Sequence, residues 1–484
     1  MRRNSSDIAA GRRRWILGPA GIATLAISIL LFGAGTAHAA GQTIVSLTFD
    51  DGTATQYSAR DMLAQHGMHA TFYVNSGRLA TNGYYMDWNQ VHDLYSDGNE
   101  IAGHTVQHVD LVNSDPTEAK RQICNDRNNL LNEGFRPTDF AYPYGSYNSS
   151  IEQMVQACGY DSARTTSTDV NETSPPGDPY AIRIVEGADL ASDESAVRAA
   201  EQRGGGWVIL LFHQICNGCG GNYITPSDFK GFLDWLQPRA ANGTVVNTVQ
   251  DVIGGSLQPS VPGPPFPAAP NGFNVLQNSS LEFDSGNGSP DCWDIYHAGN
   301  NTASWTRTTD AHSGSSAERV DVSNYTDGDN KLLVHFDLGS CTPTVLPGHR
   351  YALKAWYKST APVYFTTWSR DSYGAFRWWT NSAQFPASST WQQASWATPA
   401  IPGGTNGLSF GLTIAAGGSL TIDDLSFDDA APTGPPDTTP PTVSIKSPAA
   451  GDTVSGIVRF RLTPPTTWLW TMLIITSMAP SLVR

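Results

Sequence analysis

The sequence predicts a multidomain protein in which a parallel α/β domain is followed by an all-β sandwich. Between residues 42 and 257, strand-like and helix-like segments alternate. This alternation predicts a parallel sheet, either open or closed as a barrel. Between residues 271 and 430, short alternating apolar runs are separated by turn residues, and no convincing helix interrupts them. That pattern is typical of a β-sandwich.

Two proline-rich stretches mark the domain boundaries. Pro259–Pro270 holds six prolines in twelve residues, and Pro432–Thr442 holds five in eleven. Such runs favour extended spacers, so residues 258–270 and 431–442 are predicted to be linkers. Residues 443–484 begin with two strand-like runs, after which the pattern fails. We expect a truncated immunoglobulin-like module or an aberrant tail there.

The N-terminus has the pattern of an export signal. Three arginines at 12–14 precede an apolar run from Trp15 to Phe32, and Ala37-His38-Ala39 is a small-x-small cleavage site. Residues 1–39 are therefore predicted to be a signal peptide cleaved after Ala39, and an uncleaved membrane anchor is the alternative. Cleavage would give a secreted protein, extracellular or cell-wall associated, with no stable membrane partner.

The charge composition limits the classes of binding partner that we expect. The formal net charge is −15, and no basic stripe follows the N-terminal region. Binding of nucleic acid depends on lysine and arginine contacts to phosphates, so a nucleic-acid partner is not expected.

The cysteines suggest disulfides, because there are six of them in a chain predicted to be exported. Cys292 and Cys341 share the later domain and are predicted to pair. Cys216 and Cys219 form either a local disulfide or bonds with Cys124 and Cys158. No second Cys-x-x-Cys occurs, so a structural zinc site is not predicted.

Within the α/β domain, apolar alternation and β-branched residues predict the strands, and longer periodic segments predict the helices. The expected strands are Ile44–Phe49, Ala70–Val74, Ile101–His104, Asp139–Tyr142, Tyr160–Ala163, Trp207–Phe212 and Thr244–Thr248. The expected helices are Ala54–His66, Pro116–Glu133 (capped by Asn113 or Ser114), Ile151–Cys158, Glu194–Arg203 and Phe229–Leu236.

Chemically active side chains follow several of these strands. Asp50 and Asp51 come directly after the first strand, and a turn at Gly52 can bring both carboxylates into one cleft. His104 and His108 follow another strand, four residues apart, the spacing that shares one face of a helical turn. Two histidines and a carboxylate form a catalytic zinc ligand set, so Asp51, His104 and His108 are candidate metal ligands.

A histidine also follows the apolar strand Trp207–Phe212. His213 at its carboxyl end fits an acid–base residue. Each pattern also has a structural explanation: an Asp-Asp turn, a surface histidine pair, or a core histidine. Their coincidence at strand ends of one parallel sheet favours a common site.

Three motifs in this order, TFDDG at 48–52, HTVQH at 104–108 and LLFH at 210–213, resemble the polysaccharide deacetylases of carbohydrate esterase family four, the NodB-homology domains. The resemblance covers residues 42–253. It implies a distorted parallel (β/α) barrel with one divalent metal, usually zinc. It also implies roles: Asp50 as catalytic base, Asp51, His104 and His108 as metal ligands, His213 as catalytic acid, and Leu210 as a wall of the acetyl pocket.

The fourth motif of the family departs from its usual Arg-x-Pro-Tyr. Pro143 and Tyr144 match, and the resemblance makes the Tyr144 backbone N–H the oxyanion donor. Ala141 stands where the arginine that pairs with the base is expected. Arg164, which follows the predicted strand Tyr160–Ala163, is the candidate replacement. Asp161 and Asp169 are the candidates for the carboxylate that orients the acid histidine.

The second domain resembles carbohydrate-binding modules of the jelly-roll type, and Leu420–Phe427 resembles their last strand. Exposed aromatic rings in such modules stack on sugars. The candidates are Trp368, Tyr373, Trp378 and Trp379. Strand alternation cannot bury both of the adjacent tryptophans, 378 and 379.

Together these features predict a metal-dependent deacetylase that hydrolyses N-acetyl groups of an N-acetylglucosamine polymer such as chitin, peptidoglycan or poly-N-acetylglucosamine. Zinc is the expected cofactor, and an acetylated polysaccharide is the expected partner. An O-acetyl xylan esterase is one alternative, and a non-catalytic polysaccharide-binding protein is another. The sequence does not predict the oligomeric state.

Overall fold

The computed structural model describes residues 41–168, 172–187, 189–219, 222–286 and 288–430, together with the backbone of two short strands, β21 (Ser444–Ser447) and β22 (Arg461–Thr463). The predicted signal peptide, the second linker and most of the C-terminal segment lie outside these residues, as does Asp169. In the described part of the chain, no helix has the length and apolar character needed to cross a membrane.

The first domain is a closed parallel barrel. Seven strands follow one another around it, and the pairing of β1 with β7 along their full length closes it. The short β10 also pairs with the start of β1. The strands are β1 (Thr43–Phe49), β2 (Thr71–Val74), β3 (Glu100–Gly103), β4 (Asp139–Ala141), β5 (Ser162–Thr168), β6 (Ile182–Glu186), β7 (Gly206–Phe212) and β10 (Thr244–Val246). The predicted barrel class is confirmed.

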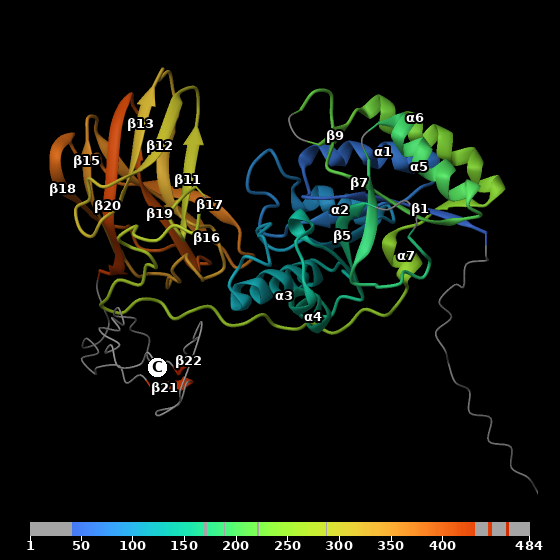
Figure 1. The fold of residues 1–484 in the computed structure, drawn as a ribbon, viewed down its shortest axis with the longest axis horizontal. Helices are drawn as coiled ribbons and strands as arrows, with labels where there is room; N and C mark the ends of the chain where they lie inside the picture. The colour runs from blue at the N-terminus through green and yellow to red at the C-terminus, as the bar shows by residue number, and fades with distance from the viewer. Residues whose placement is uncertain are drawn as a thin grey trace, which may run out of the picture. The chain divides into compact units, whose positions relative to one another are not determined.

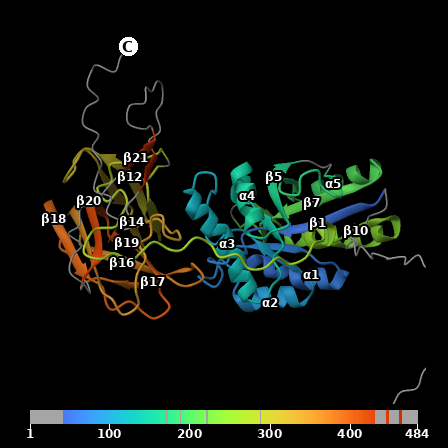
Figure 2. The ribbon, with the colours of Figure 1, turned by 90° about the horizontal axis from the view of Figure 1, so that it is seen from below.

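Helices pack on the outside of the barrel (Figures 1 and 2). They are α1 (Ala59–His66), α2 (Trp88–Ser96), α3 (Pro116–Asn132), α4 (Ser149–Ala157), α5 (Leu190–Gln202), α6 (Pro226–Leu236) and α7 (Val249–Ile253). Alternate strand residues, such as Val45, Leu47 and Leu210, join helix residues such as Leu63 and Phe229 in one apolar core. Burying this surface is the main stabilising contribution to the domain.

The helix predictions were wrong in two details. Asp115, rather than Asn113 or Ser114, caps α3: its carboxylate accepts the N–H groups of Thr117 and Glu118, and Pro116 occupies the first helical position. The predicted helix Ala54–His66 divides into a 3₁₀ turn (Ala54–Ser58) and α1. The sequence analysis also missed α2, α7 and strand β6.

Three disulfides join the described cysteines: Cys124–Cys158, Cys216–Cys219 and Cys292–Cys341. The first links α3 to the end of α4. The second closes a short loop between the two-residue strands β8 (Gln214–Ile215) and β9 (Tyr223–Ile224). The predicted 292–341 pair is present, and the 216–219 pair is the local one.

The second domain consists of two five-stranded antiparallel sheets, in the orders β11-β14-β19-β16-β17 and β12-β13-β20-β15-β18. Their inner faces enclose an apolar core that includes Leu332, Leu353, Phe410 and Phe427. The predicted sandwich is thus confirmed. Its strands are β11 (Trp293–Ala298), β12 (Thr302–Thr308), β13 (Ala317–Ser323), β14 (Asp329–Val334), β15 (Tyr351–Ser359), β16 (Val363–Arg370), β17 (Phe376–Asn381), β18 (Ser388–Ala397), β19 (Gly407–Ile414) and β20 (Gly418–Asp429).

The first proline-rich linker contacts α3 instead of acting as a free spacer. Arg127 donates to the carbonyls of Gln258 and Pro259, and Arg121 donates to the carbonyl of Pro265. The linker forms no strand, so these carbonyls accept side-chain donors in place of strand partners. The barrel, the linker and the sandwich belong to one compact unit.

Candidate active site

The two aspartates lie at the carboxyl end of β1. The backbone turns sharply there, because Asp51 and Gly52 both have positive φ angles, 74° and 67°. Asp50 is buried and its N–H bonds to the carbonyl of Phe212. The turn brings one oxygen of Asp50 to 3.8 Å and one of Asp51 to 3.5 Å from the same nitrogen, Nε2 of His104. Both carboxylates therefore lie near one imidazole nitrogen.

The two histidines follow β3, but they do not lie on a helix. The segment His104–His108 is a loop, and Thr105 and His108 adopt left-handed backbone angles, with φ of 66° and 55°. The expectation of a helical turn was wrong, because the spacing of four residues is met by a loop instead. The imidazole rings still lie 4.8 Å apart, centroid to centroid.

Asp51, His104 and His108 are arranged as a metal-binding group. One ligand atom from each lies within 4.8 Å of the others, and Nε2 of His108 is 3.2 Å from Oδ1 of Asp51. That buried oxygen has no hydrogen-bond donor among the described residues. A buried carboxylate oxygen facing two imidazole nitrogens is a donor set suited to a divalent cation.

Protonation and orientation fit the same interpretation. Nδ1 of His104 lies 2.7 Å from the carbonyl oxygen of Ala141, which fixes the proton on Nδ1 and leaves Nε2 free to ligate. Burial and the nearby His104 lower the pKa of His108 to about 3. Burial opposes ionisation of Asp51, but its contacts with His104, His108 and His213 hold its pKa below the usual range. The group thus offers a carboxylate and neutral imidazole.

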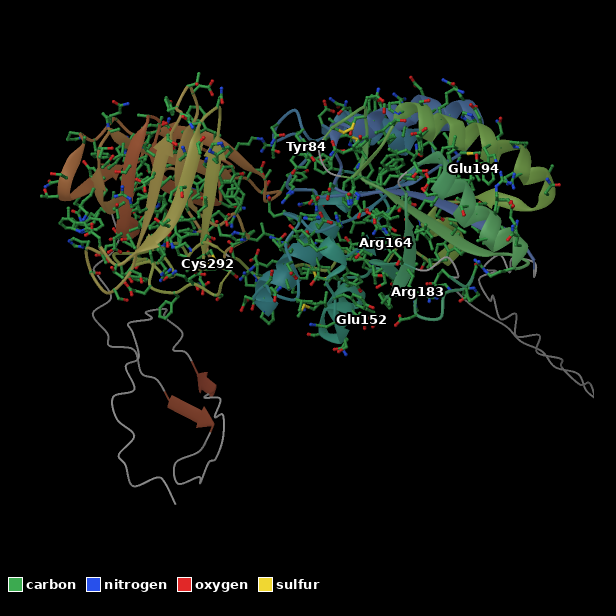
Figure 3. The ribbon with its side chains drawn as sticks, turned by 45° about the horizontal axis from the view of Figure 1, so that its top comes forward. Tyr84, Glu152, Arg164, Arg183, Glu194 and Cys292 are labelled. Carbon is green, nitrogen blue, oxygen red and sulfur yellow. A yellow bond between two sulfur atoms is a disulfide. The ribbon has the colours of Figure 1, made fainter. Side chains whose placement is uncertain are left out.

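Arg164, the candidate replacement for the arginine missing at position 141, pairs with Asp50. Its guanidinium donates to the carboxylate of Asp50 and lies over the ring of Tyr73, 4.7 Å from the centroid. In the β4–β5 ladder, Arg164 is the direct partner of Ala141. Arg164 therefore lies on the strand next to Ala141 at the same level of the barrel, and Figure 3 labels it.

His213 follows β7 at the same end of the barrel. Its carbonyl accepts hydrogen bonds from Thr53 and Gln56, residues that directly follow the Asp51 turn. Burial lowers the pKa of His213 below its usual value, and the charge of Asp51 opposes that shift. Its Nδ1 is buried without a hydrogen-bond partner among the described residues. Asp161, a candidate partner, lies instead at the opposite end of the barrel, just before β5 begins.

The assignment of Leu210 to the acetyl pocket was wrong by one residue. Successive residues of β7 point to opposite sides. Leu210 belongs to the helix-facing core, whereas Leu211 belongs to the interior cluster with Ile44 and Ile209. Leu211 therefore shares the face of His213, two residues later, and is the apolar side chain placed to line a pocket beside it.

Pro143 and Tyr144 form a short 3₁₀ turn after β4. Pro143 is buried, while the ring of Tyr144 is 66% exposed and lies edge-on to His108, 4.5 Å between centroids. Tyr144 has a φ of 59°, so the backbone is turned sharply beside the metal-binding group. Both residues lie at the site.

Comparisons with known proteins agree with this geometry. Residues 37–163 match the family described as polysaccharide deacetylase. The peptidoglycan-N-acetylglucosamine deacetylase of Bacillus cereus is 28% identical over 119 residues, 24% of this chain and 54% of the relative. The chitooligosaccharide deacetylase of Rhizobium leguminosarum is 28% identical over 142 residues, 28% of this chain and 59% of the relative. The chain thus spans little more than half of these relatives.

Residues 37–163, the first part of the α/β domain, are thus similar to the polysaccharide deacetylase family. Among solved structures, the family 4 carbohydrate esterase from Streptomyces lividans in complex with acetate is similar, with 19% identity and a TM-score of 0.31, covering 46% of this chain and all of that one.

The sequence analysis missed three residues beside the candidate site. Tyr84 and Tyr85 lie in the loop between β2 and α2, which pairs with the aspartate turn through the bond from Met86 N–H to the Gly52 carbonyl. Tyr84 is exposed (Figure 3). Arg78 donates to the Tyr85 hydroxyl and to the carbonyl of Gln107. An aromatic pair in a loop after a barrel strand was the available signal, because sugar rings stack on exposed aromatics.

The predicted sugar-stacking residues of the sandwich have different environments. Trp378 is 57% exposed, whereas Trp379 packs against the apolar core, as alternation required. Trp368 is half-buried beside Phe336. Tyr373 does not fit a stacking role, because its ring packs against Trp88 and its hydroxyl donates to Glu133.

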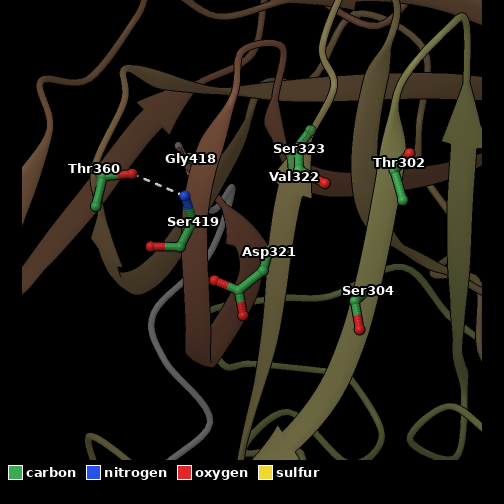
Figure 4. A pocket seen from close by; sticks show the side chains of 8 residues that line it. All are labelled: Thr302, Ser304, Asp321, Val322, Ser323, Thr360, Gly418 and Ser419. Atoms are coloured by element: carbon green, nitrogen blue, oxygen red, sulfur yellow. Dashed lines mark hydrogen bonds between the residues drawn. The ribbon is translucent and has the colours of Figure 1, made fainter.

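The outer face of the other sheet has a polar depression of its own (Figure 4). Hydroxyl groups dominate its lining, and Thr360 accepts a hydrogen bond from the N–H of Ser419. The lining residues are Thr302, Ser304, Asp321, Val322, Ser323, Thr360, Gly418 and Ser419. The lining contains no aromatic ring for a sugar to stack on.

Proposed function

We propose that the protein is a secreted, metal-dependent deacetylase that hydrolyses N-acetyl groups of an N-acetylglucosamine-containing polysaccharide. The observation that carries the proposal is the close grouping of the Asp50, Asp51, His104 and His108 side chains, with Arg164 paired to Asp50. A chain that only bound polysaccharide would not require a buried aspartate–arginine pair beside an unpartnered ligand oxygen.

Asp51, His104 and His108 would hold the metal, which we propose to be zinc. A bound divalent cation would acidify a water molecule and polarise the acetyl carbonyl. The protein keeps its ligands in the required state: His104 is oriented by the Ala141 carbonyl, and His108 stays neutral because burial lowers its pKa.

Asp50 is the proposed base. It lies beside the ligands without being one of them, and Arg164 fixes its orientation. Its free oxygen can accept the proton of the attacking water as the tetrahedral adduct forms. The Tyr144 backbone N–H is proposed to stabilise the oxyanion of that adduct.

His213 is the proposed acid. When the C–N bond breaks, the amine nitrogen leaves only if it receives a proton, and a protonated His213 would donate it. A lowered pKa makes the imidazolium a stronger donor. Leu211 would pack against the acetyl methyl group and Tyr84 against a sugar ring.

The deciding experiment measures acetate release from chitin oligomers, peptidoglycan fragments and acetylated xylan, with and without a chelator. We expect release from one of the N-acetylglucosamine substrates, loss with the chelator and recovery with zinc. Release from xylan alone would instead identify an O-acetyl esterase. No release from any substrate, with retained binding to them, would identify a non-catalytic binding protein. Detection of the cleaved chain in the culture medium tests secretion.

A further inference from the structure

The sandwich touches the loop that carries the metal-binding histidines. Between His104 and His108 lie Thr105, Val106 and Gln107. The Gln107 amide Nε2 donates to the carbonyl of Gly374, in the turn that joins β16 to β17, at 2.5 Å. Val106, fully buried, packs so closely on that turn that a Cβ added to Gly374 would lie 2.6 Å from its Cγ1.

Helix α3 forms a second connection between the same parts. Its residues Glu118, Gln122 and Asp126 are spaced four apart and are buried despite their polarity. Glu118 accepts hydrogen bonds from the Leu338 N–H of the sandwich, at 2.7 Å, and from the Gln122 side chain, at 2.8 Å. Buried polar groups of this kind must be paired, so the helix fixes its neighbours on both sides.

The same helix face holds the metal loop by its backbone. The Gln122 amide oxygen accepts the N–H of Gln107, and the Asp126 carboxylate accepts the N–H of His104, both at 2.9 Å. A continuous set of hydrogen bonds therefore runs from Leu338 of the sandwich through α3 to the histidine loop. The loop needs such support, because two of its residues have left-handed backbone angles that are unfavourable for side-chain-bearing residues.

The turn itself is anchored to the barrel by Tyr373. Its hydroxyl donates to Glu133 at 2.7 Å, its carbonyl accepts from Asn129 at 2.8 Å, and its ring packs 5.6 Å from that of Trp88. Anchoring on both sides of Gly374 leaves the turn little freedom to move away from Val106.

We propose that the turn of residues 371–375 is a clamp that positions the metal-binding loop, so that the sandwich is part of the catalytic unit and not an independent binding module. This inference deepens the proposed function and rests on it for its effect on catalysis. Gly374 and Tyr373 are positioning residues: they act on His104 and His108 through Val106, Gln107 and α3.

The test uses the full chain with Gly374→Ala and a matched control, Gly404→Ala. Both glycines have a φ of 83°, but an added Cβ meets Val106 and Leu338 at position 374 and nothing within 4 Å at position 404. Backbone strain is therefore equal, and only the first variant disturbs the contact between the turn and the metal loop. The readouts are amide hydrogen exchange of residues 104–108 without metal, zinc affinity, and kcat and KM on a short soluble chitin oligomer.

For Gly374→Ala we expect at least tenfold faster exchange in residues 104–108, at least tenfold weaker zinc binding, and a lower kcat with KM nearly unchanged. Gly404→Ala should match the wild type. Wild-type exchange and zinc affinity in a folded Gly374→Ala protein would overturn the proposal. If that variant does not fold, Tyr373→Phe decides, since it removes one hydrogen bond without a clash, and faster exchange of the loop is again required.

The exchange measurement separates the two proposals. If Gly374→Ala speeds exchange of the loop but the wild-type protein releases no acetate, the proposed function is refuted and the clamp proposal stands. Normal acetate release with an unaffected loop would refute the clamp alone.

Discussion

Two buried carboxylates, one in each domain, have different surroundings. In the sandwich, the Asp337 carboxylate accepts three backbone N–H groups, from Gly339, Cys341 and Thr342, and Arg370 donates to the carbonyl of Asp337 and to Asn406. In the barrel, Oδ1 of Asp51 and Nδ1 of His213 are buried without partners among the described residues. A carboxylate satisfied by backbone N–H groups serves the fold, whereas the Asp51 oxygen at a strand end faces the two imidazoles of the proposed metal site.

The largest effect should follow removal of the proposed base. Asp50→Asn keeps the shape of the side chain but cannot accept a proton, so acetate release should fall about 10³-fold. The metal ligands stay in place, and zinc binding should be unchanged in a calorimetric titration. His104→Ala should lose both. An Asp50→Asn enzyme with wild-type rates would show that the comparison misidentifies the catalytic carboxylate.

Arg164 tests whether the barrel's buried pair is catalytic or only structural. Arg164→Ala leaves Asp50 unpaired in the interior, which should cost about 3–5 kcal/mol in stability and lower the rate about 100-fold through loss of orientation. Denaturant unfolding and acetate release measure the two effects.

The matched variant places the arginine on the neighbouring strand. Ala141 is the ladder partner of Arg164 and lies in the same small cluster as Tyr73. The double variant Ala141→Arg/Arg164→Ala should therefore recover part of the rate. Recovery of stability without any recovery of rate would contradict an orienting role.

The sequence predicted the candidate ligands and the candidate base, which the structure places close together, because each is a local signal, a polar residue directly after an apolar strand. It failed where three-dimensional packing decides. The buried face of α3, with Gln122 and Asp126, has the composition of an exposed face, and only the fold shows that a loop and a second domain cover it. Leu210 and Leu211 are adjacent in a strand, so they face opposite sides of the sheet. A short run in which every residue is apolar does not show which of them faces the barrel interior.

The sandwich offers a pH-dependent contrast through Glu318. It is buried on β13, and burial raises its pKa to about 7, against the opposing charge of Arg307. The folded state therefore binds a proton that the unfolded state releases above its lower pKa, so stability falls as pH rises from about 4.5 to about 7. Between pH 5 and 8 this loss amounts to about 2–3 kcal/mol.

Glu318→Gln should remove this pH-dependent loss of stability, because glutamine does not ionise. Calorimetric unfolding of the full chain should show that the stability of the variant changes less between pH 5 and 8 than that of the wild type. Parallel pH profiles for the two proteins would mean that Glu318 is ionised throughout, as a fully satisfied carboxylate would be.

The smallest effect concerns two adjacent tryptophans of β17, one on each side of the sheet. If exposed aromatics of the sandwich bind polysaccharide, Trp378→Ala should weaken binding to insoluble chitin about threefold to tenfold, the equivalent of one aromatic contact. Its melting temperature should stay unchanged, because the ring is 57% exposed. Trp379→Ala should leave chitin binding unchanged but lower the stability by about 2 kcal/mol, because the Trp379 ring packs on the core. If both variants bind insoluble chitin as tightly as the wild type, these tryptophans do not contribute to substrate binding. The contact with the metal loop would then be the remaining proposed role of the sandwich.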